Sequence, residues 1–391
     1  MARFKFMLVL ASACVFTLGV QELHAATLTY IVGTCKAGTR FSTIQGALNA
    51  SPAPNIVEVC PGTYNEQITI KKAVTLEGIS IANSAAVRIE PPSAGLATNT
   101  TINGSDAAAA HVFVENVSGP VILTNLIVDS TNNKVTSGVF LLGVFYQHSP
   151  GTVNHVQAFN QQGGAGGFGI YLEGDSANPS VTVENCTVNF YGFGGIYVVG
   201  PNGPGVSTTS TEITAAIKNN FISSNGTTNT TSMFMGSGAD ATVTANVTNG
   251  GAFGIVFESS KGSVNGNTFV GPGVGMDLTA DGASVTANKF YNAEFDGLVL
   301  ETDVNASQIT GNIFTTVQTG IAFDCHTVGS PNTVHSNTFV DLNTGYENAP
   351  KSFSGSNTYI GVTTEILACT TPSAMHGSAA DMLRAMRERR D

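Results

Sequence analysis

The chain has 391 residues, enough for two or three ordinary domains, yet only 11 % of them are charged and 44 are glycine. The apolar fraction of 42 % excludes a disordered chain, and the net charge of −11 argues against a nucleic acid partner, because phosphate binding requires a basic surface. Low charge together with many Gly, Asn, Thr and Val residues is typical of short β-strands joined by tight turns.

Residues 1–26 have the pattern of a secretory signal peptide. Arg3 and Lys5 give a positively charged start, and an apolar run at 6–20 follows. Because this run is short for a membrane span, we expect cleavage after the segment and no integral membrane span in the mature chain. The protein is then secreted, periplasmic or at the cell surface, where disulfides form.

Six cysteines occur, one of them in the signal segment. Cys35 and Cys60 flank a compact N-terminal unit, and Cys325 and Cys369 flank the last repeats. A disulfide near each end would limit fraying of an elongated molecule. The remaining Cys186 is expected to be a small buried apolar residue.

Residues 41–50 predict a short amphipathic helix. Ser42 and Gln45 form a capping box, and the apolar side chains fall on one helical face: Phe41, Ile44, Ala47 and Leu48. Short alternating strands follow at 55–60, 67–70 and 74–78, and the first two are separated by a Pro-Gly-Thr-Tyr turn.

The segment FSTIQGALNASPAPNIVEVCPGTYNEQITIKKAVTLEGIS, residues 41–80, resembles the opening of right-handed parallel β-helix proteins of the pectin-lyase-like superfamily. In those proteins the first helix caps the open N-terminal end of the solenoid, and the substrate groove runs along an outward strand face. The resemblance implies an all-β, single-stranded right-handed parallel β-helix of about ten coils over residues 27–371, with 41–50 as its capping helix. It specifies the fold far better than the activity.

Residues 100–235 form less regular coils. Asn125, Asn154 and Asn185 are spaced 29 and 31 residues apart and are candidate ladder positions of longer coils. The glycine-rich stretch 161–167 and the stretch 201–211 are loop insertions, which in solenoids often form the binding surface. The glycine-rich stretch precedes no helix and lacks Lys-Ser or Lys-Thr, so it does not indicate a phosphate site.

Two features recur in the second half of the chain. An Asn before a short strand recurs every 20 to 26 residues, at positions 220, 246, 267, 288, 312, 337 and 357. A Gly opens an apolar run at Gly254, Gly275, Gly297 and Gly320. Such a period indicates a solenoid. We expect the Asn residues to form sharp left-handed bends and to hydrogen-bond along the rod, so their role is structural.

Counting alternate side chains from the Gly marks places a set of carboxylates on one outward strand face: Glu258, Asp277, Glu301 and Asp324. Lys261 lies three residues after Glu258, and His326 follows in a turn. Glu301 and Asp324 would lie about 5 Å apart on neighbouring coils. This arrangement predicts a general acid–base pair for a sugar chain, a Ca²⁺ site, or a solvated acidic stripe that prevents strand pairing between molecules.

The same count from Gly169 places Tyr171 and Glu173 outward. His148 and His155 are seven residues apart across a Pro-Gly turn, and two imidazoles alone make a poor metal site. We therefore expect both histidines to be surface or loop residues.

The named chemistries of the superfamily fit this chain poorly. Pectate-lyase-like elimination uses an Arg or Lys base beside a calcium cluster, but no Arg occurs between Arg88 and Arg384, and only Lys261 lies near the carboxylates. The motifs of polygalacturonases and pectin methylesterases are missing, and Asp324-Cys325-His326 resembles an alginate epimerase motif only loosely. The catalytic candidates are thus Glu301, Asp324, Asp277, Glu258, Lys261 and His326, with lyase, hydrolase and epimerase reactions all open.

Residues 372–391 differ from the repeats. Ser378 and Asp381 form a capping box before a helical apolar stripe at Ala379, Met382, Leu383 and Met386, and four arginines follow or intersperse it. This tail is an end-covering helix, a frayed terminus or a docking element.

The sequence as a whole predicts a secreted single-domain β-helix that engages an extracellular polysaccharide along its acidic outward face. Whether it cleaves, isomerises or only holds the polymer stays open, as does a need for Ca²⁺. The alternative is a non-catalytic structural or adhesive rod.

Overall fold

The computed structural model describes most of the chain, over residues 27–80, 86–200, 211–224, 229–259, 261–301, 304–323, 332–349 and 356–368. The expected signal peptide, the C-terminal tail and the expected Cys325–Cys369 disulfide lie outside these ranges. No helix among the described residues is long and apolar enough to cross a membrane.

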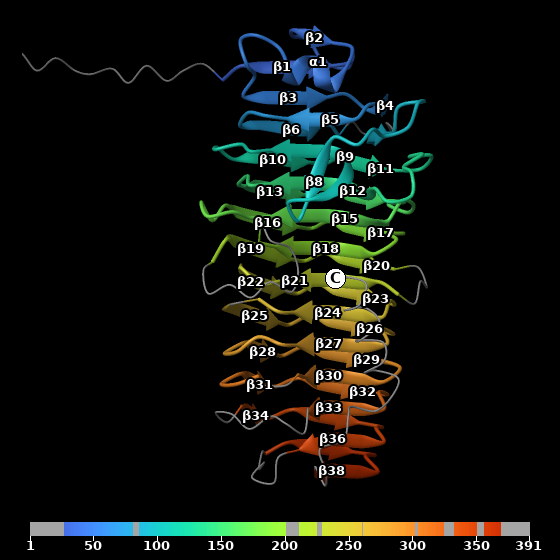
Figure 1. The fold of residues 1–391 in the computed structure, drawn as a ribbon, viewed down its shortest axis with the longest axis vertical. Coiled ribbons are helices and arrows are strands. Elements are labelled where there is room, and N and C mark those ends of the chain that lie inside the picture. The colour runs from blue at the N-terminus through green and yellow to red at the C-terminus, as the bar shows by residue number, and fades with distance from the viewer. Residues whose placement is uncertain are drawn as a thin grey trace, which may run out of the picture.

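Three parallel sheets run the length of a rod, and the chain visits them in turn (Figure 1). Sheet A has 13 described strands. In spatial order they are β2 (Arg40–Phe41), β1 (Thr29–Val32), β3 (Ile56–Val59), β6 (Val74–Gly78), β10 (Val121–Thr124), β13 (Gly151–Asn154), β16 (Ser180–Glu184), β19 (Ile213–Lys218), β22 (Ala239–Thr244), β25 (Lys261–Asn265), β28 (Ser284–Thr286), β31 (Gln308–Thr310) and β34 (Thr333–His335).

Sheet B is made of short strands, mostly of three residues, and has 12 described strands. From the N-terminal end they are β4 (Gly62–Asn65), β7 (Val87–Glu90), β11 (Ile127–Asp129), β14 (Gln157–Phe159), β17 (Thr187–Asn189), β20 (Phe221–Ser223), β23 (Val247–Asn249), β26 (Thr268–Val270), β29 (Lys289–Tyr291), β32 (Ile313–Thr315), β35 (Thr338–Val340) and β37 (Thr358–Ile360).

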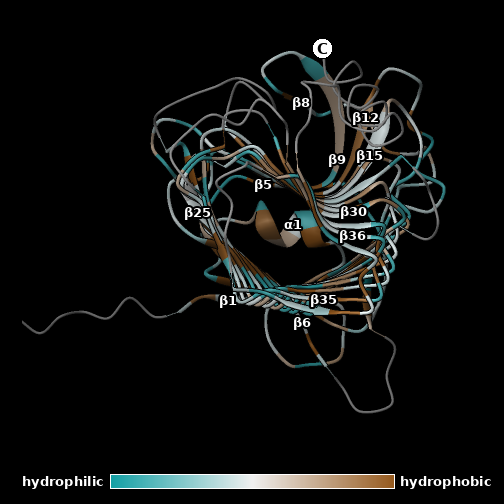
Figure 2. Cartoon of the chain, turned by 90° about the horizontal axis from the view of Figure 1, so that it is seen from below, coloured by the Kyte–Doolittle hydropathy of each residue, from teal (hydrophilic) through white to brown (hydrophobic). Residues whose placement is uncertain are grey.

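Sheet C contains the longest strands and positions the candidate site. Its parallel strands are β5 (Ile68–Ile70), β9 (Asp106–Glu115), β12 (Phe140–Gln147), β15 (Gly166–Glu173), β18 (Gly194–Val199), β21 (Thr231–Met235), β24 (Phe253–Phe257), β27 (Val274–Leu278), β30 (Asp296–Leu300), β33 (Thr319–Phe323), β36 (Thr344–Ala349) and β38 (Thr364–Ala368). One further strand, β8 (Thr100–Ile102), pairs antiparallel with β9. In Figure 2 the long strands β9, β12 and β15 reach beyond the shorter strands of the sheet.

The architecture confirms the predicted parallel β-helix, although the rod has more coils than expected. The sheets have 12 or 13 described strands, against about ten coils expected for residues 27–371. At about 4.8 Å per strand the described rod is about 60 Å long.

Inward side chains from the three sheets stack on their equivalents one coil away and form a continuous core. Phe269, Phe290, Phe314 and Phe339 illustrate this stacking, because their ring centroids lie 4.8 to 5.1 Å apart. Each of these rings belongs to an Asn-x-Phe mark of the sequence. The alternation of buried and partly exposed residues along each strand therefore follows directly from the parallel stacking.

The repeated Asn residues are buried between sheets A and B and hydrogen-bond along the rod. Asn246 donates its side-chain N–H to Oδ1 of Asn267 over 3.0 Å, and Asn267 donates in the same way to Asn288. The left-handed bend, however, lies one residue earlier, as at Ala245 (φ 56°) and Ala287 (φ 55°). The expectation that the Asn itself forms the bend was wrong, because its side chain is needed to satisfy buried backbone groups.

The earlier coils have no Asn at the equivalent position. Its occupants are Leu126, Val156 and Cys186. The backbone carbonyl of each accepts a backbone N–H from the next coil, as the carbonyl of Asn220 does. Asn125 and Asn185 take the left-handed position one residue earlier, with φ of 56° and 55°. Asn154 ends β13 two residues before Val156. The three residues are therefore out of register with the buried Asn positions, although Asn185 donates its side-chain N–H to Oδ1 of Asn154 on the neighbouring coil over 3.0 Å. Cys186 is buried as expected.

Helix α1 (Ile44–Leu48) covers the N-terminal end of the core, as predicted for residues 41–50. Ile44 and Ala47 are fully buried. The N-cap is Thr43 rather than the expected Ser42, because Thr43 Oγ1 accepts the backbone N–H of Gly46 over 3.1 Å. The carboxylate of Glu66, just after β4, accepts the backbone N–H groups of Ile44 and Gln45 over 2.8 and 2.9 Å. Buried N–H groups at the start of the helix are thus satisfied by this carboxylate.

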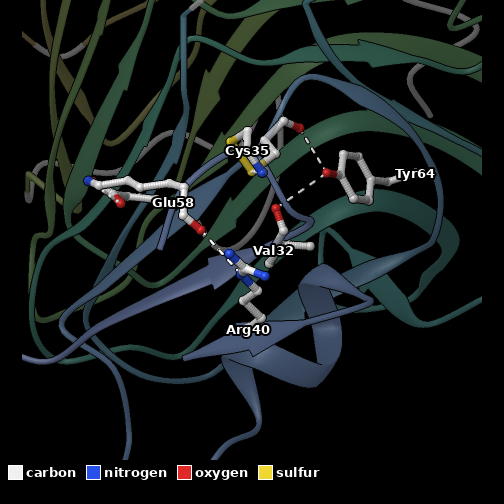
Figure 3. Close-up of a disulfide and its surroundings, with 7 residues drawn as sticks. Val32, Cys35, Arg40, Glu58 and Tyr64 are labelled. Atoms are coloured by element: carbon white, nitrogen blue, oxygen red, sulfur yellow. Dashed lines mark hydrogen bonds and ion pairs between the residues drawn. A yellow bond between two sulfur atoms is a disulfide. The ribbon is translucent and has the colours of Figure 1, made fainter. Parts of the chain in front are cut away.

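The predicted disulfide between Cys35 and Cys60 is present and joins the first coil to the second. Figure 3 shows Tyr64 beside it, with its hydroxyl directed to the carbonyl oxygen atoms of Cys60 (2.8 Å) and Val32 (3.5 Å). The N-terminal end of the rod is therefore closed by a helix, a covalent bond and the hydrogen bonds of a half-buried tyrosine.

Candidate functional site

A column of polar side chains follows the carboxyl ends of the strands of sheet C. Glu115, Gln147 and Glu173 lie in register on β9, β12 and β15. Parallel pairing places successive members about 4.8 Å apart. We call this set the strand-end column, and its described members are Lys71, Glu115, Gln147, Glu173, Val199, Gly236, Glu258, Thr279 and Glu301.

Asp277 does not belong to the strand-end column. It pairs in register with Val256 and Val299, which lie two residues before Glu258 and Glu301. The three carboxylates therefore lie on the same outward face of sheet C, as expected, but at two different positions, because Asp277 is two residues after its glycine whereas Glu258 and Glu301 are four residues after theirs. Glu258 and Glu301 are two coils apart, which separates their backbones by about 10 Å.

The expected carboxylates are also less exposed than a solvated stripe requires. Asp277 is 2 % exposed and Glu301 is 7 % exposed, whereas Glu258 is half-buried. The physical reason is that the outer face of sheet C is itself packed with apolar side chains. The other expected residues lie outside the described part of the chain, namely Asp324, His326 and the side chain of Lys261. Contact between Glu301 and Asp324 thus stays a prediction.

A row of aromatic rings runs beside the strand-end column. Phe113, Phe145, Tyr171, Tyr197 and Phe234 lie in register on five successive strands of sheet C, two residues before the column. Neighbouring ring centroids are 4.9 to 6.1 Å apart. All five rings are buried. This outer aromatic row is a second apolar cluster that packs on the outside of the solenoid.

Glu173 is a buried carboxylate of the column with several partners. Its Oε2 accepts the backbone N–H of Asn103 over 3.0 Å, and its Oε1 accepts the side-chain amide of Gln147 over 3.1 Å. Nε2 of His148 lies 3.4 Å from the same Oε1. Only 2 % of Glu173 is exposed. A buried carboxylate requires such donors, because an unpaired charge would be strongly destabilising.

Asn103 belongs to the segment that follows β8, and it ties this segment to the column. Its Oδ1 accepts the hydroxyl of Tyr171 over 2.9 Å, and its Nδ2 faces Asp106 at 3.4 Å. Gln147 also donates to the carbonyl oxygen of Thr101 over 3.1 Å. The β8 segment is therefore fixed over the outer face of sheet C by hydrogen bonds to two adjacent strands.

His148 and His155 occupy left-handed bends at the two ends of β13, with φ of 48° and 52°. They do not meet. His155 is exposed, as expected, whereas His148 is half-buried and bonds Asn116 through Nδ1 over 3.0 Å. The hydrogen bond with Glu173, and then the charges of Glu173 and Asp175, raise the pKa of His148 above its usual value. The sequence did not reveal this partnership.

A cleft of about 510 Å³ adjoins the start of the strand-end column. It lies between α1 and the turn from β5 to β6, and its lining includes Gln45, Asn49, Thr69, Lys71 and Lys72. Lys71 also pairs with Glu115 over 3.0 Å. The cleft, whose lining also includes the apolar residues Leu48, Ala53, Pro54, Ile70 and Val74, therefore meets the first members of the column at Lys71.

The surface where they meet offers donors and acceptors in a row. Lys71 is exposed and Glu115 and Gln147 are half-buried, so they provide donors and an acceptor at the surface, and His148 beside them supplies an imidazole whose pKa is raised. Glu173 is buried and positions Gln147 and His148. Side chains that alternate in this way can bind the hydroxyl groups of a polar polymer. Clefts with a few convergent polar groups are the usual form of small-ligand sites.

Solved structures with the same fold include enzymes and viral proteins. A GH136 lacto-N-biosidase from Eubacterium ramulus is 11 % identical with a TM-score of 0.57, and the match covers 87 % of this chain and 68 % of that one. A tailspike of E. coli bacteriophage HK620, solved with a hexasaccharide, is 13 % identical with a TM-score of 0.51 and covers 78 % and 58 %. At such identities the likeness shows the fold alone. No curated protein matches the chain.

The family comparison is more specific than the structural one. Residues 169–366, about half of the chain, match the model of a family described as periplasmic copper-binding protein (NosD). The match begins at Gly169 in β15, just before Tyr171 and Glu173, and ends in β38. Its repeats are those that form the regular coils of the rod. The chain therefore belongs to the NosD family of right-handed parallel β-helix proteins.

Proposed function

We propose that this protein acts outside the cytoplasm and binds a polysaccharide along the surface formed by the α1 cleft and the first members of the strand-end column. The family description names the periplasm, and the Cys35–Cys60 disulfide suits an oxidising compartment. The polymer would lie along the rod axis and cross successive strands.

The observation that carries the proposal is the register of Lys71, Glu115 and Gln147, which are exposed or half-buried on three adjacent strands, so accessible polar groups repeat about every 4.8 Å. Glu173 on the next strand is buried and holds the side-chain amide of Gln147 in place. A linear polymer with regularly spaced hydroxyl groups can use such a row repeatedly, whereas a small ligand can use only one or two of its members. The row opens into the cleft at its N-terminal end.

The structural neighbours support the proposal by analogy only. The lacto-N-biosidase is named as a glycosidase, and the tailspike was solved with a hexasaccharide. Both share the parallel β-helix fold with this chain, but a shared fold does not establish a shared function, because function depends on the residues of a site. The analogy therefore selects which ligands to test first.

The test is a binding panel of uronic-acid and neutral polysaccharides, with and without Ca²⁺, measured by affinity electrophoresis and calorimetry. One polymer should bind, and Lys71→Ala and Gln147→Ala should each weaken its binding at least tenfold. Thr242→Ala, an exposed change on sheet A, should leave binding unchanged. The proposal fails if no polymer binds, or if the two column variants bind as the parent does.

An enzymatic form of the proposal rests on Glu301 together with Asp324, and also on Glu258, Lys261 and His326. New reducing ends or double bonds in the same panel would establish it. Glu301→Gln should then abolish turnover while leaving binding intact. Unchanged turnover in this variant would remove Glu301 from the catalytic candidates.

The burial of Asp277 and Glu301 favours a second candidate, a non-catalytic adhesive or structural rod. Asp277 stands in the outer aromatic row's register between Val256 and Val299, where a polymer would not reach it. A stable rod with neither turnover nor glycan binding would support this candidate.

Copper, which the family description names, does not fit the described residues. Proteins hold copper through Cys, Met and His donors. No three His, Cys, Asp or Glu side chains come together in the described ranges. Burial raises the pKa of the Cys186 thiol to about 12, which opposes the thiolate that metals require. Both ring nitrogens of buried His111 have protein partners, Ser130 and the carbonyl of Glu66. The proposed function therefore places no copper on the residues that the structure describes.

A further inference from the structure

The C-terminal end of the rod is open as far as the structure describes it. β34, β37 and β38 are the last strands of sheets A, B and C, and no described strand pairs with their outer edges. Figure 2 is viewed from this end, and α1 at the far end is seen through the ring of strands without a described helix in front of it. The two ends of the rod thus differ.

The core itself reaches the surface at this end. Ile366 pairs in register with Tyr346 and therefore continues an inward-facing row. Tyr346 is fully buried, but Ile366 is 47 % exposed because no described coil stacks on it. Ile360 and Leu367, at outward positions in register with Val340 and Glu347, are 54 % and 44 % exposed at the same end. These are the three highest exposures among the exposed large apolar residues of the described chain.

An open solenoid end of this kind is usually covered by another segment or another chain. Unpaired strand edges recruit other chains, and the terminal repeats of solenoids carry caps that keep the rod soluble. At the other end α1 does this with only five residues and buries Ile44 and Ala47. The exposed Ile366 and its neighbours therefore mark a docking surface for one specific occupant.

We propose that residues 372–391 of the same chain form this cover, which we call the C-terminal cap. They lie outside the described residues, and the argument rests on their sequence and on the surface they would meet. Apolar residues at helical spacing follow a capping box, at Ala379, Met382, Leu383 and Met386. This stripe matches the apolar character of the exposed end.

Two observations favour the chain's own segment over a second copy. Only residues 369–371 separate β38 from the segment, so tethering gives it a high effective concentration at this end. The arginines at 384, 387, 389 and 390 complement the exposed carboxylates of Asp341 and Glu365 near the last coil. The corresponding end of a second copy would present the same carboxylates, so two such ends gain no charge attraction for each other.

Amide hydrogen exchange on the mature full-length protein tests the proposal. A chain that stops after Thr371 and a full-length Leu383→Asp variant should both exchange the amides of β37 and β38 at least tenfold faster than the parent. Exchange in β9 and β12 should not change, which shows that the rod stays folded. Glu388→Gln, a charge change outside the apolar stripe, should behave as the parent does.

A synthetic peptide of residues 372–391, added to the shortened chain, should restore slow exchange in β37 and β38. Unchanged exchange in both variants would overturn the proposal. So would a full-length dimer that dissociates when the segment is removed or when Leu383 is replaced, because the segment would then join two copies rather than cover its own end.

Discussion

The ring of Phe314 occupies the space in which a side chain on Gly297 would lie. A Cβ added to Gly297 would stand 2.3 Å from Cδ1 of Phe314, closer than real contacts permit. Gly254, Gly275 and Gly320 face the rings of their own Phe neighbours in the same way. The repeated Gly of sheet C and the repeated Phe of the Asn-x-Phe segments in sheet B thus pack directly against each other.

Gly297→Ala should lower the free energy of unfolding by about 1–3 kcal/mol, because the added methyl group overpacks the core. Urea denaturation measures this loss. Phe314→Leu shortens the opposing side chain, so the same Gly297→Ala change should cost less in that background. Equal costs in both backgrounds would mean that the ring is not what excludes the methyl group.

Asn267→Ala should destabilise the rod by several kcal/mol. Asn267 is fully buried, donates to Val243 O and Asn288 Oδ1, and accepts twice from Asn246. Its removal leaves these partners unsatisfied at about 1–3 kcal/mol each. The control is Asn265→Ala, an exposed change two residues earlier, which should shift the melting temperature little. A similar shift in both variants would contradict the role of the buried amide.

The stabilising contribution of His148 to the folded protein should be lost as the pH rises. Its pKa is raised in the folded state by Glu173, so its contribution to stability is complete below its unfolded pKa of about 6.5 and disappears as the pH passes the folded pKa. Urea titrations at pH 6 and pH 8 measure the difference. His148→Gln should remove this part of the pH dependence, and a variant with the parent's profile would show that the pair does not form.

His111 should act in the opposite direction. Burial lowers its pKa to about 4, so the unfolded chain binds a proton below pH 6.5 that the folded chain refuses. Between pH 7 and pH 5 this linkage should reduce the free energy of unfolding by about 2 kcal/mol. His111→Gln should flatten the acid limb of the stability profile by that amount, although the variant is less stable at pH 7. An unaltered acid limb would mean that His111 titrates normally.

The regular features of the fold were predictable because stacking repeats them. Periodic Asn and Gly residues identified the solenoid, and residues 41–50 identified the N-terminal helix. Periodicity cannot show which of two adjacent residues forms the left-handed bend and which one carries the buried side-chain amide. That is why the bend was assigned to Asn246 instead of Ala245, and Asn185 was aligned where Cys186 lies.

The candidate site was predictable only in part. Counting from Gly169 placed Tyr171 and Glu173 on the outer face, as the structure has them. The count could not show that this face is packed rather than solvated, because burial there depends on the outer aromatic row. Nor could it show that Asn103, which lies 70 residues before Glu173, supplies a backbone N–H to its carboxylate.

The closure of the N-terminal end has a consequence for how the rod comes apart. The Cys35–Cys60 bond and α1 hold the first coils together, and each later coil touches only its neighbours. Coils should therefore peel away one by one from the opposite end. Limited proteolysis would then leave a nested ladder of fragments that share one beginning and differ only in where they stop.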